Sequence, residues 1–205
     1  MTIAEFLHLL RHRLWSTCEI ILLVRSPDTP LPKHAISCPG EFRDVTEENI
    51  RDCGQFEDIS MVSVYRKMLS DGFSGQYGYL NGACVYRAWT QHRGKIDFEG
   101  CTVMSLPEHA WYSCYVYCAP EARGNGFHRA GIAETIRQFP DETAYTMILP
   151  EKPWSMRNYI LNGFKPYSSI TAKNRFLHRS LCERLLSPDE ISACLFKLTQ
   201  RSNDP

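Results

Sequence analysis

The sequence lacks a surplus of charge of either sign and has no long hydrophobic run. Lysine and arginine together number 23, as do aspartate and glutamate, so the formal net charge is zero. Proteins that bind nucleic acid through its phosphates usually carry a basic surplus, so this composition disfavours nucleic acid as a partner. The longest apolar run, Ile20 to Val24, is far shorter than the ~20 residues of a membrane-spanning helix. Glu5 and Arg11 interrupt the apolar residues before it, so we expect no signal peptide, no membrane partner and a soluble, cytoplasmic protein.

The nine cysteines lack the spacings of a metal or redox site, because no pair forms a Cys-x-x-Cys motif. Cys114 and Cys118 lie on a predicted strand, where about 3.3 Å per residue separates them by roughly 13 Å. That separation excludes one shared metal ion or an undistorted disulfide. His8 and His12 lie one helical turn apart without a third ligand nearby, which favours two surface histidines. We expect reduced cysteines packed as small apolar residues, and no metal.

Two well-known phosphate-binding motifs are also missing. Counting from Gly124, the pattern G-x-G-x-x-G fails because Arg129 occupies its last position, and no Gly-Lys-Ser/Thr of a P-loop is present. What is present is an aromatic, β-branched run from Trp111 to Cys118, then a glycine-containing loop at 123–128 that leads into a predicted helix. A strand, a glycine loop and a helix start present free backbone N–H groups to an anion. Arg123 would add a cation beside those groups.

A second distinctive stretch follows one predicted helix and one predicted strand later. From Lys152 to Phe164 the chain reads Lys-Pro-Trp-Ser-Met-Arg-Asn-Tyr-Ile-Leu-Asn-Gly-Phe. Pro153 in a first turn and Gly163 just beyond the last turn predict a helix between them.

Together, the two stretches resemble the GNAT superfamily of N-acetyltransferases. The loop at 123–128 is similar to that superfamily's Arg/Gln-x-x-Gly-x-Gly/Ala loop, which holds the pyrophosphate of acetyl-coenzyme A. His128 departs from this pattern, and Lys152 stands where a later pattern, Asn-x-x-Ala/Ser-x-x-x-Tyr-x-x-x-Gly-Phe, has Asn. Four residues match the remaining positions of the later pattern: Ser155, Tyr159, Gly163 and Phe164.

The order of predicted elements indicates one α/β domain over residues 1–205, with an N-terminal helix and a C-terminal extension. Asn81-Gly82 between two apolar alternations predicts a β-hairpin. The resemblance implies a mixed, mostly antiparallel twisted central sheet with helices on both faces, splayed between two central strands, Trp111–Cys118 and Thr143–Leu149. The other predicted segments are a helix from Thr2 to Leu14, strand Glu19–Arg25, helices from Thr46 and over Asp58–Leu69, a strand near Ile96–Val103, helix Gly126–Phe139, an extended run Phe164–Ile170 and helix Pro188–Leu198.

The resemblance also implies a site for coenzyme A in the gap between the two central strands. Backbone groups of Val116 and Cys118 would pair with the pantetheine arm, as in strand addition to an open edge, and one would polarise the thioester carbonyl. N–H groups of the 123–128 loop would hold the pyrophosphate. The expected cofactor-binding residues are Val116, Cys118, Arg123, Gly124, Asn125, Gly126, Phe127, His128 and Ser155.

For catalysis, Tyr159 matches the superfamily's usual proton donor to the leaving thiolate, although a tyrosine that merely packs its helix onto the sheet is the alternative. Glu99 is our candidate for the general base. The alternatives for that role are three other side chains of the same segment, or bulk water without a dedicated base. Cys114 and Cys118 lack a neighbour in sequence that would lower a thiol pKa, which disfavours a cysteine nucleophile. The three alternative bases are Asp97, Glu108 and His109.

These observations predict an N-acyltransferase that moves an acetyl group from acetyl-coenzyme A to a primary amine by direct attack. The small-molecule acceptor stays open between an amino sugar, an amino acid and a small amine. A longer acyl donor, free or on an acyl carrier protein, is one alternative, and a basic patch beside the cleft would favour it. A non-catalytic scaffold that binds coenzyme A or a partner is another, and a filled cleft would favour it. A homodimer is an open alternative for the oligomeric state.

Overall fold

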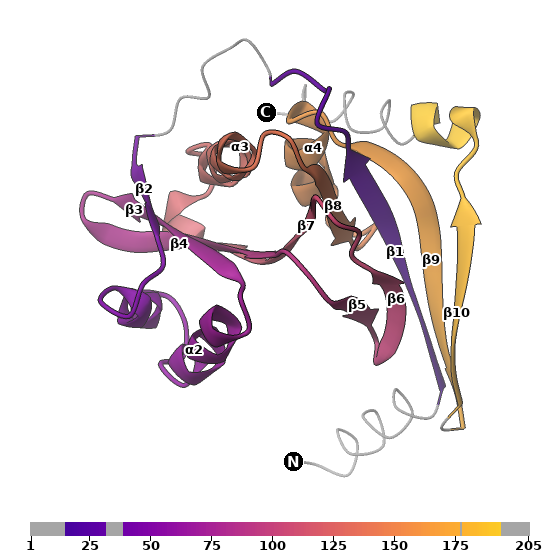
Figure 1. Cartoon of the computed structure of the whole chain (residues 1–205), viewed down its shortest axis with the longest axis horizontal. Coiled ribbons are helices and arrows are strands. Elements are labelled where there is room, and N and C mark those ends of the chain that lie inside the picture. Colours follow the sequence, from indigo (N-terminus) through magenta and orange to yellow (C-terminus); the bar gives the residue numbers. More distant parts are fainter. Residues whose placement is uncertain (1–14, 32–38, 177, 194–205) are drawn as a thin grey trace.

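An eight-stranded sheet dominates the structure, a computed structural model that describes residues 15–31, 39–176 and 178–193 (Figure 1). Neighbouring strands are antiparallel except β7 and β8, which are parallel. This mixed, mostly antiparallel sheet is the one expected. From one edge to the other the strands are β10 (His178–Leu185), β9 (Lys165–Arg175), β1 (Trp15–Arg25), β8 (Thr143–Ile148), β7 (Ala110–Cys118), β4 (Ala83–Gln91), β3 (Ser74–Leu80) and β2 (Glu41–Asp44).

Strand β1 lies between β8 and β9, although it precedes both by more than a hundred residues in the chain. It begins at Trp15 rather than at the predicted Glu19, because its polar first residues continue the ladder with β9. Its last residue, Arg25, is buried and donates from Nε to the carbonyl of Asn162 at 3.1 Å. A strand from the start of the described chain therefore completes the middle of the sheet.

Helices α3 (Phe127–Gln138) and α4 (Pro153–Leu161) cover one face of this sheet, opposite α2 (Figure 1). Their apolar side chains pack with Ile21 and Leu23 of β1 and with the centre of β7 and β8. Neighbouring residues on a strand point to opposite faces. Ile21 and Leu23 therefore belong to this cluster, while Ile20 and Leu22 pack on the opposite face of the sheet. This period of two explains why the apolar run at 20–24 is continuous.

The opposite face is covered by two separate pieces. The 3-10 helix η1 (Ile50–Gln55) and helix α2 (Met61–Ser70) pack on β3 and β4. The hairpin of β5 (Lys95–Phe98) and β6 (Cys101–Ser105) packs on β1, β8 and β9. The predicted helix from Thr46 and the predicted strand near 96–103 were therefore wrong in detail: the first is a 3-10 turn that starts later, and the second is two strands.

The turn between β3 and β4 confirms the predicted hairpin. Asn81 and Gly82 both have positive φ angles, 52° and 82°, which the tight two-residue turn requires. The helix predicted over residues 2–14 lies outside the described residues, and the last predicted helix is described only at 188–193, where the chain is helical. Within the described ranges, no helix is long and apolar enough to cross a membrane.

Candidate active site

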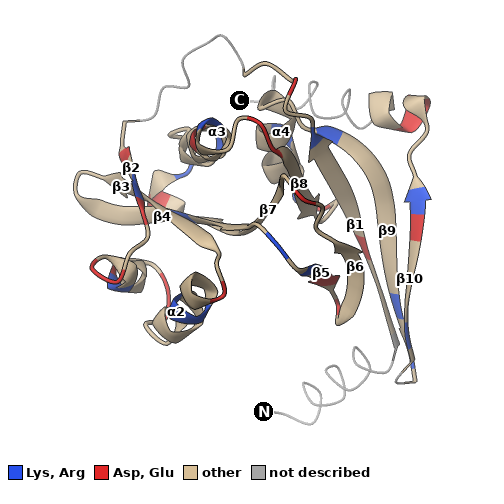
Figure 2. Ribbon diagram, in the orientation of Figure 1, with Lys and Arg blue, Asp and Glu red and all other residues tan. Residues whose placement is uncertain are grey.

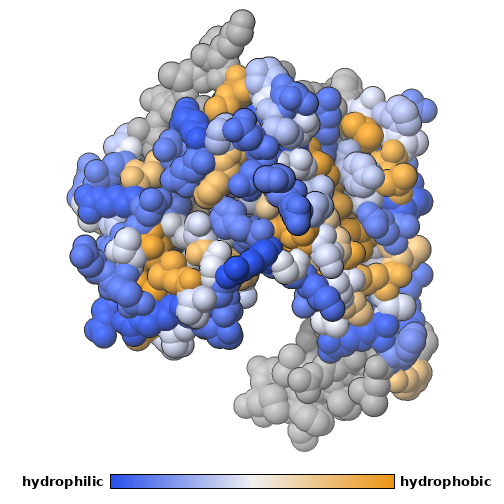
Figure 3. Space-filling view, in the orientation of Figure 1, coloured by the Kyte–Doolittle hydropathy of each residue, from blue (hydrophilic) through white to orange (hydrophobic). Residues whose placement is uncertain are grey.

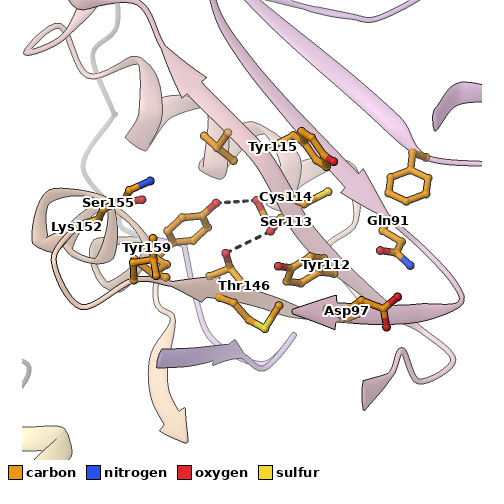
Figure 4. Close-up of a pocket in the computed structure, with 16 residues that line it drawn as sticks. Gln91, Asp97, Tyr112, Ser113, Cys114, Tyr115, Thr146, Lys152, Ser155 and Tyr159 are labelled. Atoms are coloured by element: carbon orange, nitrogen blue, oxygen red, sulfur yellow. Dashed lines mark hydrogen bonds between the residues drawn. The ribbon is translucent and has the colours of Figure 1, made fainter. Parts of the chain in front are cut away.

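The two central strands are paired along only part of their length. The parallel ladder of β7 and β8 runs from Ala110–Thr143 to Ser113–Thr146 and then stops. Beyond that point β7 stays paired with β4 alone, and β8 with β1 alone. The sheet is therefore splayed between its two central strands, as expected, and a cleft of about 470 Å³ opens where they diverge (Figure 4).

A bulge in β7 lies at the point of divergence. Two residue steps of β4, from Arg87 to Trp89, face three steps of β7, from Tyr117 to Cys114. The bulged segment of β7 contains Tyr115, whose φ of 49° is rare for a residue with a side chain. A bulge of this kind changes the direction of the strand and leaves backbone groups without their ladder partners, next to the cleft.

Arg87 braces this bulge from β4. Its Nη1 donates to the carbonyl of Tyr115, while its Nε donates to Glu57 Oε1 and Oε2 at 2.9 and 3.0 Å. The guanidinium also lies over the rings of Tyr65 and Tyr117, 5.6 Å from each centroid. The side chains of the ion pair are only 12% and 15% exposed, so solvent screens it weakly. Glu57, in the connection between η1 and α2, thereby ties that part of the chain to the bulge.

Tyr159 reaches the cleft from α4. Its hydroxyl lies 2.7 Å from Ser113 Oγ, and Thr146 Oγ1 donates to the Ser113 carbonyl at 3.3 Å (Figure 4). Burial raises the pKa of the Tyr159 phenol to about 12, and hydrogen bonds with Ser113 and Thr146 oppose the rise only in part. Tyr159 is 2% exposed, lines the cleft and is protonated over the physiological pH range. The cleft wall therefore carries a protonated phenol hydroxyl.

Beyond the bulge, β7 keeps its pairing with β4 but no longer pairs with β8. The N–H of Ala119 donates to the Val85 carbonyl at 2.8 Å, and Cys118 pairs with Tyr86. Because backbone groups of consecutive strand residues point to opposite edges, those of Cys118 point away from β4, toward the side where β8 has diverged. Of the two residues expected to meet a pantetheine arm, Val116 lines the cleft, whereas the carbonyl of Cys118 accepts a hydrogen bond from Arg123.

The glycine loop follows the end of β7 through the 3-10 turn η2 (Pro120–Ala122). Gly124 and Gly126 have φ angles of 82° and 78°, which only glycine adopts without strain. Gly126 is the N-cap of α3 and supplies no capping side chain, so the N–H groups of the first helical turn have no side-chain cap. Arg123 Nε donates to the Cys118 carbonyl at 3.1 Å, so its guanidinium folds back along β7.

His128 points into the protein rather than along the loop. Its Nδ1 lies 3.2 Å from Asn158 Nδ2, and its ring meets Tyr159 edge-on with centroids 5.4 Å apart. Its Nε2 is buried without a hydrogen-bond partner. Burial lowers the pKa of the imidazole to about 4, so the side chain is neutral near pH 7. Through its side chain His128 packs between α3 and α4, which leaves its backbone N–H as the group available to an anion.

The cleft has two ends of different chemistry (Figure 4). We call them the α4 end, lined by Lys152, Ser155 and Tyr159, and the β5 end, lined by Phe73, Gln91, Ile96 and Asp97. Lys152 and Asp97 are the only charged residues among the described residues that line the cleft, one at each end. On the face shown in Figure 3, the surface is hollowed between the part that carries α2 and the part that carries β5 and β6.

Glu99, the predicted base, does not line this cleft. It is exposed at the tip of the β5–β6 turn, with a φ of 51°, and its carbonyl accepts a hydrogen bond from Arg179 Nη1 at 3.2 Å. Glu108 and His109 are exposed and also absent from the lining. Of the four side chains considered for this role, the structure brings only Asp97 into the cleft.

Cys114 is half-buried, and the loss of solvent around its thiol raises the pKa to about 12. Its Sγ donates to the Trp89 carbonyl at 3.5 Å. A protonated, engaged thiol is a poor nucleophile, which agrees with its expected role as a small apolar residue. The described cysteines are all free thiols, and the described residues contain no group of three or more potential metal ligands.

No family model matches the sequence, and no curated protein matches it either. Solved structures do match. One is a GCN5-related glucosamine N-acetyltransferase region of a fungal multi-domain β-N-acetylglucosaminidase, with a TM-score of 0.56, 13% identity and coverage of 88% of this chain and 23% of that one. Another is a functionally unknown conserved protein from Staphylococcus epidermidis, with a TM-score of 0.55, 14% identity and coverage of 85% and 69%.

A third similar structure is an acetyltransferase assigned to the GNAT family from Novosphingobium aromaticivorans, with a TM-score of 0.53 and 13% identity. The match covers 77% of this chain and 64% of that one, so the chain spans less than two thirds of this relative. At these identities the likeness establishes the fold. The chain has the acyl-coenzyme A N-acyltransferase fold of the GNAT superfamily, as the two sequence stretches implied.

Proposed function

We propose that the protein is an N-acyltransferase that moves an acetyl group from acetyl-coenzyme A to a primary amine of a small molecule. The observation that carries the proposal is the protonated hydroxyl of Tyr159, buried on the wall of an open cleft between β7 and β8. Similar structures named as acetyltransferases support the same class.

The residues present suit a coenzyme A thioester. Backbone groups of Val116, which lines the cleft where the ladder to β8 has ended, would pair with the pantetheine arm. The uncapped N–H groups at the start of α3 would hold the pyrophosphate, with the positive end of the helix dipole behind them. Lys152 and Ser155 line the α4 end, where an ammonium and a hydroxyl suit an anionic, polar cosubstrate. Bound acetyl-coenzyme A would supply an activated thioester.

In the proposed reaction the neutral amine attacks the thioester carbon, a C–N bond forms and the C–S bond breaks. Tyr159 gives its proton to the departing thiolate and regains one from the solvent through Ser113. The amine loses a proton to water or to Asp97, the carboxylate in the cleft lining. Backbone N–H groups beside the bulge at Tyr115, which Arg87 braces, would bind the carbonyl oxygen, where negative charge develops.

Two features favour this activity over the alternatives. A cleft of about 470 Å³ beside Tyr159 leaves room for reactants, whereas a pure scaffold would need no such space. Figure 2 shows basic and acidic residues interspersed over the described elements rather than sorted by sign, and an acidic carrier protein would call for a basic face. Free acetyl-coenzyme A is therefore the proposed donor.

The test is thermal unfolding with and without acetyl-coenzyme A, followed by detection of thiol release with an amine present. At a ligand concentration of 100 Kd, binding adds about 2.7 kcal/mol to the free energy of unfolding, which raises Tm measurably. Adenosine monophosphate is the matched control, because it lacks the pantetheine arm. An unchanged Tm at millimolar acetyl-coenzyme A would contradict the proposal.

A further inference from the structure

We infer that the acceptor is a primary amine with an apolar or aromatic body and no carboxylate, and that Asp97 at the β5 end of the cleft selects it. This inference rests on the proposed function and adds the class of acceptor. It is argued from the groups that line the β5 end and from the distribution of charge along the cleft.

Part of the wall of the β5 end is apolar, beside the polar side chains of Gln91 and Asp97. Phe73 precedes β3, and Ile96 is a buried residue of β5; both line the cleft. The ring of Tyr112 lies between Asp97 and Thr146 in Figure 4. Burial raises the pKa of the Tyr112 phenol, so the ring carries no charge at neutral pH. An aromatic or aliphatic body removes its own apolar surface from water against such walls.

The polar groups at this end are few and partly used. Gln91 Nε2 already donates to the carbonyls of Arg93 and Lys95, at 2.7 and 3.0 Å, so its oxygen is the part left for a ligand. A sugar would bring several hydroxyl groups that need partners, and unpaired hydroxyl groups in a binding site lower affinity. The β5 end therefore suits an amino sugar less well than an apolar amine.

The charge at this end has one sign. Asp97 carries the only charge in the described lining of the β5 end, and the other charged lining residue, Lys152, lies at the opposite end (Figure 4). Thr102 Oγ1 donates to Asp97 Oδ1 at 2.7 Å, which orients the carboxylate and leaves Oδ2 for a ligand. An ammonium group is attracted to this oxygen, whereas the carboxylate of an amino acid is repelled and meets no cation among the described residues that line this end.

The closing experiment compares three acceptors by kcat/KM at saturating acetyl-coenzyme A: phenethylamine, phenylalanine and glucosamine. Phenethylamine and phenylalanine differ only in the α-carboxylate. We expect phenethylamine to exceed phenylalanine by about 30-fold, because Asp97 repels the carboxylate of phenylalanine. We expect it to exceed glucosamine by a similar factor, because the hydroxyl groups of the sugar find few partners at the β5 end. Asp97→Asn should reduce the preference for phenethylamine over phenylalanine by about tenfold. The matched control is Asp141→Asn, which removes an exposed carboxylate outside the cleft lining and should leave the preference unchanged.

The outcomes separate the inference from the function on which it rests. Phenylalanine or glucosamine acetylated as well as phenethylamine would overturn the inference and leave the proposed function standing. So would a preference that survives Asp97→Asn in full. Acetyl-coenzyme A that raises Tm without acetylation of any of the three amines would also overturn the inference. No rise in Tm and no thiol release would overturn the proposed function itself.

Discussion

The two ends of the cleft differ in how the chain builds them. The α4 end comes from one continuous stretch, the strand–loop–helix–strand–helix segment from Trp111 to Phe164. The β5 end gathers single residues from three places: Phe73 before β3, Gln91 at the end of β4, and the first half of the β5–β6 hairpin. The first end carries recognisable motifs because its geometry is local. The second has none, because its geometry depends on how distant segments pack.

Their chemistry differs in the same way. The α4 end holds a buried hydroxyl with a raised pKa and a lysine, which suit proton transfer and an anionic cosubstrate. The β5 end holds apolar walls and a carboxylate, which suit recognition of a cation. If this division is correct, substitutions at the α4 end change turnover, and substitutions at the β5 end change which acceptor is used.

The largest effect is expected at the α4 end. Tyr159→Phe removes the proton donor and should lower kcat by about 10²- to 10⁴-fold, with little change in the KM for acetyl-coenzyme A. Steady-state kinetics measures both constants. Ser113→Ala is the comparison variant: it keeps the phenol of Tyr159 and removes only the hydroxyl through which the phenol regains its proton, so it should cost less in kcat than Tyr159→Phe. An unchanged kcat in Tyr159→Phe would exclude the tyrosine from the chemistry.

The dependence of the reaction rate on pH is a second test of Tyr159 as the proton donor. With a pKa of about 12, the Tyr159 phenol keeps its proton well above neutral pH, while the acceptor amine becomes neutral as pH rises. The rate of the wild-type protein should therefore increase from pH 6 to 9 without an alkaline decline in that range. A decline near pH 8 would point to a different proton donor.

The brace between Glu57 and Arg87 ties the connection between η1 and α2 to the bulge of β7 and gives the next largest effect. Arg87→Leu leaves the Glu57 carboxylate partly buried without its cation and should lower the free energy of unfolding by about 2–4 kcal/mol. Urea denaturation measures this difference. The control is Asp71→Asn, which breaks an exposed pair with Lys67 and should cost less than about 1 kcal/mol. Equal losses in the two variants would contradict a brace that is shielded from solvent.

A smaller effect is expected at the glycine that ends α4. Gly163 has a φ of 89°, and a Cβ there would lie 2.7 Å from Thr29 Cγ2. Gly163→Ala should therefore lower the free energy of unfolding by about 1–3 kcal/mol, from backbone strain plus the steric clash. Gly82→Ala is the matched control: its φ is 82°, but a Cβ there meets nothing within 4 Å. Denaturation of both variants separates clash from strain, and equal losses would mean that the contact with Thr29 relaxes without cost.

The smallest expected effect comes from His128. Its folded pKa of about 4 lies below the usual 6.5, so between those values the unfolded chain binds a proton that the folded protein does not. Stability should fall as pH drops through this window, by about 1–2 kcal/mol more in the wild type than in His128→Gln. Denaturation at pH 7 and pH 4.5 measures the difference, and parallel losses would show that the imidazole is not held neutral by burial.

Local patterns predicted much of the fold correctly. Asn81-Gly82 predicted the β3–β4 turn, and the predicted helix Gly126–Phe139 agrees with α3 to within one residue at each end. These features depend on short-range geometry, such as positive φ angles at a tight turn or the period of a helix. Local patterns did not predict the β5–β6 hairpin, because its short strands alternate only weakly between apolar and polar residues. Its turn also contains Glu99, and Glu adopts positive φ less readily than Asn or Gly.

The sequence alone was enough to predict the fold class, the loop at 123–128, the stretch from Lys152 to Phe164 and the candidate Tyr159. Each of these depends on residues that are close together in the chain. Tertiary structure decided three other matters: β1 lies between β8 and β9, His128 points inward, and Asp97 rather than Glu99 lines the cleft. Asp97 and Glu99 are two residues apart and would share one face of a continuous strand. The turn after Phe98 places Glu99 at the exposed tip, and only the packing of the hairpin against the sheet determines which carboxylate lines the cleft.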